Sequence, residues 1–204
     1  MNLIRISPPA ALPLSLAEVK ALAGLEGLDE SEDARIAAYL RAAVERVEGP
    51  DGWIQRALIT QTWALRLDAF PGTLTYRPGF IWRGEFCPTH LEIELPLPPL
   101  QSVTSITYLS GGVEETLDTS AYQVAGIGDR NKARLRPAVS WPTTDDIADA
   151  VMITFVAGYG DSWNDVPEVI RQAITLMVQG FYDGCESEAA THLLRPYRVD
   201  LSLA

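Results

Sequence analysis

The chain has 204 residues, of which 47% are hydrophobic, and this size and composition support one large folded domain or two small ones. A formal net charge of −11 argues against a protein that grips the phosphate backbone of a nucleic acid over a broad surface. The two cysteines, Cys87 and Cys185, are far apart and lack metal-type spacing, which argues against a disulfide framework and a zinc site.

The N-terminal third predicts two helices. Ser15 and Glu18 have the spacing of a capping box, so the first helix is expected from about residue 16 to residue 23. The second helix opens in the acidic sequence DESED, shows apolar residues at helical spacing, and ends at Gly49 and Pro50. Its polar face has the composition of an ordinary solvated surface.

The middle of the chain predicts antiparallel β structure, because its hydrophobic period changes to two after residue 58. The expected strands cover residues 59–68, 91–95, 103–109, 113–117, 122–125, 133–136 and 151–156. Prolines 96, 98 and 99 cannot donate ladder hydrogen bonds, so they indicate a sheet edge or a crossover. Residues 70–89, rich in Gly, Pro and aromatic side chains, are interpreted as a long protruding loop or hairpin.

A last strong helix is expected after the sequence DSWNDVP, capped by Asn164 or Asp165 and ending near Gly184. The fold class is therefore α+β. Residues 1–57 and 161–188 are expected to form a small helical bundle, residues 58–160 an inserted antiparallel β-sandwich or barrel-like domain, and residues 189–204 a C-terminal docking tail.

The end of the chain is unusual in composition. Apolar groups alternate there with two arginines, and Pro196 stiffens the backbone. A disordered terminus is usually polar, so this composition favours docking onto another surface. The residues concerned are Leu193, Leu194, Arg195, Pro196, Tyr197, Arg198 and Val199.

A basic stretch precedes an acidic one. Arg130, Lys132, Arg134 and Arg136 alternate with other residues, so a strand would place all four cations on one face. From residue 138 to residue 170 there are six acidic residues and no Lys or Arg. The basic face is interpreted as a solvated strand face or a charge-matched contact between subunits, with DNA contact a weaker alternative.

Three of the five tryptophans have informative positions. Trp63 and Trp141 have the positions of core residues, whereas Trp82 lies in the loop rich in Pro and Gly. Trp82 is either an exposed subunit contact or folds back onto the sheet.

Signals for catalysis are weak, and we expect no enzyme, cofactor or bound metal. His90 and His192 have no partner at helical spacing, and no HExxH or GxSxG motif occurs. The adjacent Asp145 and Asp146 are interpreted as loop residues rather than an acid-base pair. The glycines around residues 127 and 159 predict turns. No apolar run is long enough for a membrane span and the N-terminus lacks a signal-peptide core, so we expect a cytosol-like compartment.

Five segments, in this order, resemble the head-to-tail connector or adaptor proteins of long-tailed bacteriophages and phage-derived gene transfer agents. They are PLSLAEVKALAGL with DARIAAYLRAAVERVE, then ALITQTWALRLDAFP, LEIELPLPPLQSVTSITYL, VMITFVAGYGDSWNDVPEVIRQAI and LLRPYRV. The resemblance implies a dodecameric ring under the portal protein at the head–tail junction of a virion or phage-like particle, with stopper and tail proteins downstream. It also implies that the C-terminal residues dock on the portal, that no catalysis occurs, and that DNA passes through the ring without specific binding.

Two expectations follow. Removal of residues from Leu193 onward should leave a folded monomer that no longer docks, and an acidic lining would keep a DNA passage non-adhesive. The alternatives are a stopper or tail-terminator protein, or a carbohydrate- or protein-binding module with its site near Trp82.

Overall fold

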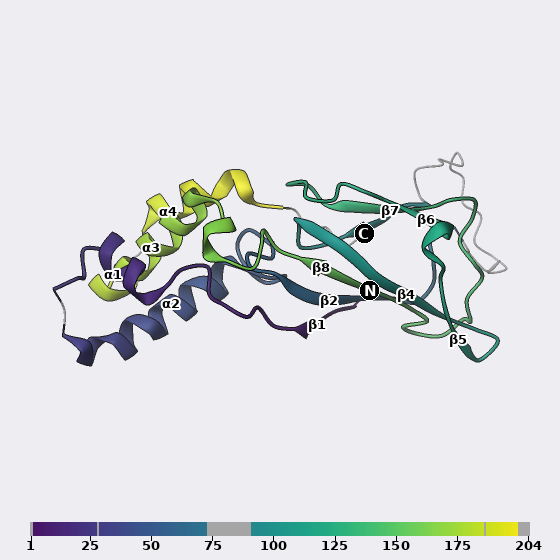
Figure 1. Cartoon of the computed structure of the whole chain (residues 1–204), viewed down its shortest axis with the longest axis horizontal. Coiled ribbons are helices and arrows are strands. Elements are labelled where there is room, and N and C mark those ends of the chain that lie inside the picture. Colours follow the sequence, from purple (N-terminus) through teal and green to yellow (C-terminus); the bar gives the residue numbers. More distant parts are fainter. Residues whose placement is uncertain (1, 28, 73–90, 186, 200–204) are drawn as a thin grey trace.

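The computed structural model describes residues 2–27, 29–72, 91–185 and 187–199. The molecule is elongated, with helices at one end and two sheets at the other (Figure 1). Two separate clusters of buried hydrophobic side chains form its core, one in the helical part and one in the β part. The α+β class predicted from the sequence is confirmed, and the described strands form no closed barrel.

Four α-helices form the helical part: α1 (Leu16–Leu22), α2 (Asp33–Val47), α3 (Glu168–Asp183) and α4 (Glu188–Leu194). The predicted capping box is present, because the Glu18 amide donates to Ser15 Oγ and the Ser15 amide donates to the Glu18 carboxylate, both at 3.2 Å. α3 ends at Gly184, whose left-handed conformation (φ 71°) suits a residue without a Cβ.

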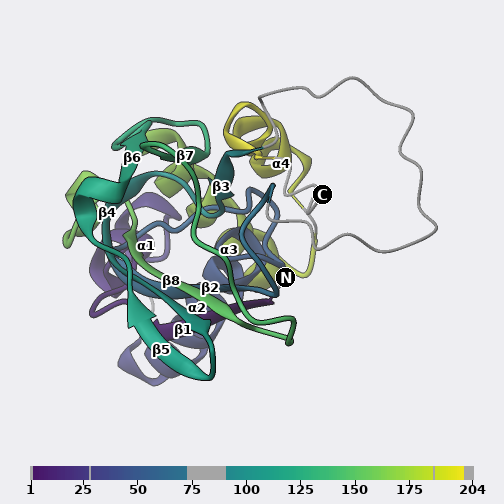
Figure 2. The ribbon, with the colours of Figure 1, turned by 90° about the vertical axis from the view of Figure 1, so that its right-hand side faces the viewer.

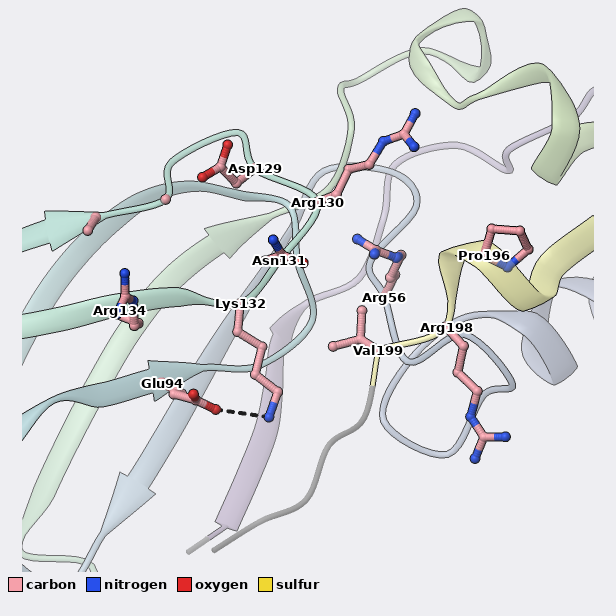
Figure 3. A pocket seen from close by; sticks show the side chains of 12 residues that line it. Arg56, Glu94, Asp129, Arg130, Asn131, Lys132, Arg134, Pro196, Arg198 and Val199 are labelled. Carbon is pink, nitrogen blue, oxygen red and sulfur yellow. Dashed lines mark hydrogen bonds and ion pairs between the residues drawn. The ribbon is translucent and has the colours of Figure 1, made fainter. Parts of the chain in front are cut away.

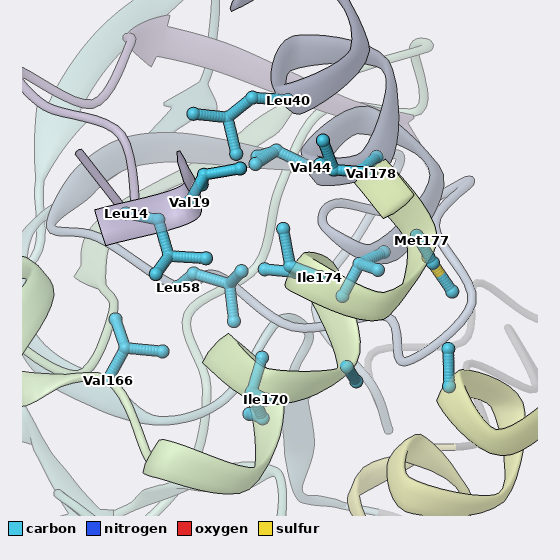
Figure 4. Close-up of a cluster of buried hydrophobic side chains, with 14 of the residues drawn as sticks. Leu14, Val19, Leu40, Val44, Leu58, Val166, Ile170, Ile174, Met177 and Val178 are labelled. Carbon is cyan, nitrogen blue, oxygen red and sulfur yellow. The ribbon is translucent and has the colours of Figure 1, made fainter. Parts of the chain in front are cut away.

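The helical core is built from one apolar stripe per helix. Val19 of α1, Leu40 and Val44 of α2, and Ile174 and Val178 of α3 converge on one another and are buried (Figure 4). Burial of one such side chain contributes about 1.5 to 3 kcal/mol, so this cluster stabilises the association of chain ends far apart in sequence.

The β part contains two antiparallel sheets. The larger has the order β1-β2-β8-β4-β5 and the smaller the order β3-β7-β6. Their strands are β1 (Asn2–Ser7), β2 (Gln61–Leu67), β3 (Ile93–Leu95), β4 (Leu100–Ser110), β5 (Val113–Thr116), β6 (Tyr122–Ala125), β7 (Ala133–Pro137) and β8 (Val151–Ala157). The small sheet lies over one face of the large one, as the end-on view shows (Figure 2). Side chains of both sheets share one core cluster, so the β part is a sandwich.

Prolines 96, 98 and 99 lie between β3 and β4, where the chain crosses from the small sheet to the large one. The predicted crossover is therefore confirmed. Trp63 and Trp141 are core residues, as expected.

Three local expectations are wrong. Residues 2–7, expected in the helical part, form β1 and pair with β2; they were missed because most of this strand is exposed and lacks clear alternation. Neither Asn164 nor Asp165 caps α3: Ser162 caps a short 3-10 turn, and α3 begins after Pro167. Phe70, expected at the start of a protruding loop, is buried.

The position of Phe70 has a specific cause. Its ring stacks on the Trp141 ring with the ring centroids 4.8 Å apart, so the chain segment that follows β2 packs into the sandwich core. Trp82 and the rest of the expected loop from residue 73 to residue 89 lie outside the described residues.

Glu48 connects the helical and β parts. Its Oε1 accepts hydrogen bonds from the Leu58 amide and from Gln61 Nε2, both at 2.7 Å. Burial raises the pKa of Glu48 above its ordinary value of 4.5, and these hydrogen bonds and the charge of Arg5 offset part of the shift. The folded protein therefore holds this proton to a higher pH than the unfolded chain does.

Glu48→Gln is expected to change the pH dependence of stability, because the amide oxygen keeps both hydrogen bonds without a titratable proton. The wild-type free energy of unfolding should fall relative to that of the variant as pH rises from about 4.5 through the raised pKa, by about 1.4 kcal/mol per unit of pKa difference. Urea titrations between pH 4 and 8 measure this difference. Glu45→Gln, an equal charge change at an exposed position of α2, is the control; a pH-independent difference for Glu48→Gln would contradict the prediction.

Candidate functional site

The C-terminal segment is packed onto the body of its own chain up to Val199. Leu194 is fully buried and Tyr197 is 8% exposed, and both belong to the helical core cluster. The predicted docking tail therefore does not include these two residues, which join the core of their own chain. The short helix α4 positions Leu194, and the 3-10 turn Arg195–Tyr197 directs Tyr197 inward.

Two hydrogen bonds fix the end of this segment. The Val199 amide donates to the Ile54 carbonyl at 3.0 Å, and Arg56 Nε donates to the Tyr197 carbonyl at 2.5 Å. Of the predicted docking residues, Arg195, Pro196 and Arg198 are exposed, whereas Leu193 and Val199 are half-buried. Any contact with another protein therefore uses the exposed residues rather than the whole segment.

A cleft of about 850 Å³ lies between this C-terminal segment and the small sheet (Figure 3). Its lining is strongly cationic, with five basic residues against two acidic ones. The basic residues are Arg56, Arg130, Lys132, Arg134 and Arg198, and the acidic ones are Glu94 and Asp129.

The predicted basic strand face exists only in part, and its cations are largely neutralised. Arg134 and Arg136 are exposed on β7 while the residues between and beside them are buried, so the alternation is confirmed for these two. Arg130 and Lys132 precede the strand, so one strand face does not carry all four cations. Arg134 and Arg136 pair with Glu92 at 3.1 and 2.5 Å, and Lys132 pairs with Glu94 at 3.0 Å. The carboxylates were not identified from the sequence, although the alternation in LEIEL places both on one side of the strand segment.

Three arginines of the cleft have no carboxylate partner within the described ranges: Arg56, Arg130 and Arg198. The Arg130 guanidinium lies over the Tyr197 ring at 5.3 Å, and that of Arg198 lies over the Trp53 ring at 4.9 Å. These three residues define what we call the arginine cleft.

Arg56 differs from the other two because it is buried, with 3% of its surface exposed. Its Nη1 is buried and finds no hydrogen-bond acceptor in the described chain. Burial lowers the pKa of Arg56, but a guanidinium has so high an ordinary pKa that it stays protonated at neutral pH. The cleft therefore has a fixed positive charge in its wall, a property suited to binding an anion.

The described residues that the sequence analysis considered for catalysis do not line this cleft. Asp145 accepts hydrogen bonds from the Gly111 and Gly112 amides at 2.8 Å, so it fixes the β4–β5 hairpin turn. His192 is exposed on α4, and His90 lies outside the described residues. In the described part of the chain, no group of His, Cys, Asp and Glu is arranged to hold a metal ion. None of the described helices combines the length and apolar character needed to cross a bilayer.

The fold defines an α+β protein in which helices from before and after the inserted β segment pack together beside a β-sandwich, and residues 2–7 add an edge strand to that sandwich. No known protein-family profile matches the chain, and no curated protein matches it.

Solved structures of gene transfer agent (GTA) particles contain chains of this fold. A chain in the virion of a native GTA particle is 24% identical with a TM-score of 0.71. A chain in the neck of an empty GTA particle, computed with C6 symmetry, is 22% identical with a TM-score of 0.73, and one in the neck of a native particle, computed with C12 symmetry, is 23% identical with a TM-score of 0.67. Each match covers 98% of this chain and 96% of the other, so the fold is shared over the whole length.

Proposed function

We propose that the protein is a structural, ring-forming component of the head–tail junction of a phage or gene transfer agent particle. The observation that carries this proposal is the fold match over 98% of the chain to a chain from the neck of a GTA particle. The cationic cleft supports it, because it offers fixed charges for binding a partner and no arrangement of a nucleophile with a base.

Within this junction we assign the protein the role of the connector between portal and tail, present in twelve copies. A reconstruction with C12 symmetry repeats each chain around a twelvefold axis, which is the arrangement implied by the resemblance of the sequence to adaptor proteins. The exposed Arg195, which does not line the arginine cleft, is available for contact with the portal. A stopper or tail terminator would occupy a different level of the same junction.

Deletion of the gene is expected to give DNA-filled heads without tails, and gene transfer or infection should fall by at least several orders of magnitude. Negative-stain electron microscopy and a transfer or plaque assay measure the two effects. Complementation with the full chain is the control. Normal tailed particles in the deletion strain would contradict the proposal, whereas tails that attach but lose DNA would assign the protein to the stopper level.

A further inference from the structure

The arginine cleft is a preorganised site for carboxylates. Tyr197 supports Arg130, Trp53 supports Arg198, and the wall of the cleft buries Arg56. An aromatic ring under a guanidinium face leaves the N–H groups along its edge available for paired hydrogen bonds to a carboxylate. Side chains that are already held lose less conformational entropy on binding, so each contact retains more of its free energy.

Acidic residues, which complement the positive charge of the cleft, are abundant in the rest of the chain. Without the five cations and two acids of the cleft, the chain retains 11 Lys and Arg against 25 Asp and Glu. The stretch from residue 138 to residue 170 contains six acids and no cation, and several of these, including Asp146 and Asp161, are exposed. A second copy of the chain therefore offers exposed carboxylates that complement the charge of the cleft.

A nucleic acid fits the site less well. The backbone of a duplex is bound through many phosphates along a broad cationic surface, and this chain has a net charge of −11. The arginine cleft is instead a local hollow with one guanidinium in its wall. A carboxylate on a side chain can enter such a hollow singly.

We propose that the arginine cleft binds an acidic surface of a second copy of this chain and forms the contact between neighbouring subunits of the ring. This inference rests on the proposed function, because a ring needs a head-to-tail contact in which two different surfaces of the same chain meet. Repetition of the contact around a closed ring stabilises the assembly beyond the affinity of one pair.

Photocrosslinking in assembled particles tests the identity of the partner. A photoreactive amino acid replaces Arg198 or, separately, Arg130 in the full chain, and the particles are purified before irradiation. The expected adduct has twice the mass of the 22.3 kDa chain, with both crosslinked peptides from this sequence. An adduct with another particle protein, or with DNA, overturns the inference.

Charge reversal tests the energetics. Arg130→Glu and Arg198→Glu are expected to reduce the particles that contain the ring at least tenfold, measured by immunoblot of purified particles. Arg41→Glu, an equal charge change at an exposed residue of α2 outside the cleft, should leave the amount within twofold. Thermal unfolding of each variant identifies misfolding, and Arg198→Lys, which keeps the charge but loses the paired N–H geometry, should give an intermediate loss. Equal losses for Arg41→Glu and the cleft variants would overturn the inference.

The experiments distinguish a failure of the proposed subunit contact from a failure of the proposed role at the head–tail junction. If the protein is present at the neck and the cleft crosslinks to a different protein, the subunit contact is wrong while the junction role stands. If purified particles contain no copy of the protein, both are wrong.

Discussion

Truncation of the chain before Leu193 is expected to lower the free energy of unfolding by at least about 4 kcal/mol and to leave the helical part aggregation-prone. The deletion removes Leu194 and Tyr197 from the helical core, and truncation of a buried leucine or aromatic residue costs about 2 to 5 kcal/mol each. It also removes the carbonyl that accepts from Arg56, which leaves that buried guanidinium without its hydrogen bond. The total is comparable with the 5 to 15 kcal/mol of a typical domain.

Urea unfolding followed by circular dichroism measures this loss. Arg195→Ala is the matched control, because it changes an exposed residue of the same segment and should shift the free energy of unfolding by no more than about 0.5 kcal/mol. A truncated chain with wild-type stability would contradict the burial of this segment. The sequence alone predicts that the truncated chain folds and only fails to dock, whereas the structure predicts a loss of stability. Docking is therefore better tested with Arg195→Glu than with a deletion.

The packing partner of the C-terminal segment could not be predicted from the local sequence. Alternating apolar and basic residues do identify an interaction segment, but they do not identify its partner. The helical core cluster that Leu194 and Tyr197 join also contains residues of α2 and α3, and these two helices are separated in sequence by residues 48–167. Where the information is local, as in the capping box of α1 or the alternation of β7, the sequence was sufficient.

The arginine cleft was predictable only in pieces. The sequence singled out Arg130 and Arg198 for different reasons, and it gave no reason to join them. Nothing in the local sequence distinguishes Arg56, because a single arginine after a helix is typical of a solvated residue. Its burial follows from the close approach of three distant segments. The aromatic rings under Arg130 and Arg198 also come from distant parts of the sequence, so no local pattern indicates the cleft.

Gly158→Ala is expected to cost about 3 kcal/mol or more, because this glycine has a φ of 134°, which L-residues rarely adopt. A Cβ at this position would lie 2.6 Å from backbone atoms of Ile59 and Thr60, and backbone cannot move aside as the end of a side chain can. The glycines around residue 159 predict a turn from the sequence, and this close backbone approach explains why glycine is needed at Gly158.

Gly111→Ala separates the two causes of that loss. Gly111 also has a positive φ, of 60°, but nothing lies within 4 Å of its added Cβ, so the variant should lose only about 1 kcal/mol. Chemical denaturation of both variants measures the difference, and equal losses would show that the clash at Gly158 does not matter.

The Gly158 amide donates to the Pro99 carbonyl and the Tyr159 amide donates to the Leu58 carbonyl, so this turn lies where the helical and β parts join. Because the arginine cleft takes one wall from each part, strain at Gly158 should also weaken ring assembly in a variant that still folds.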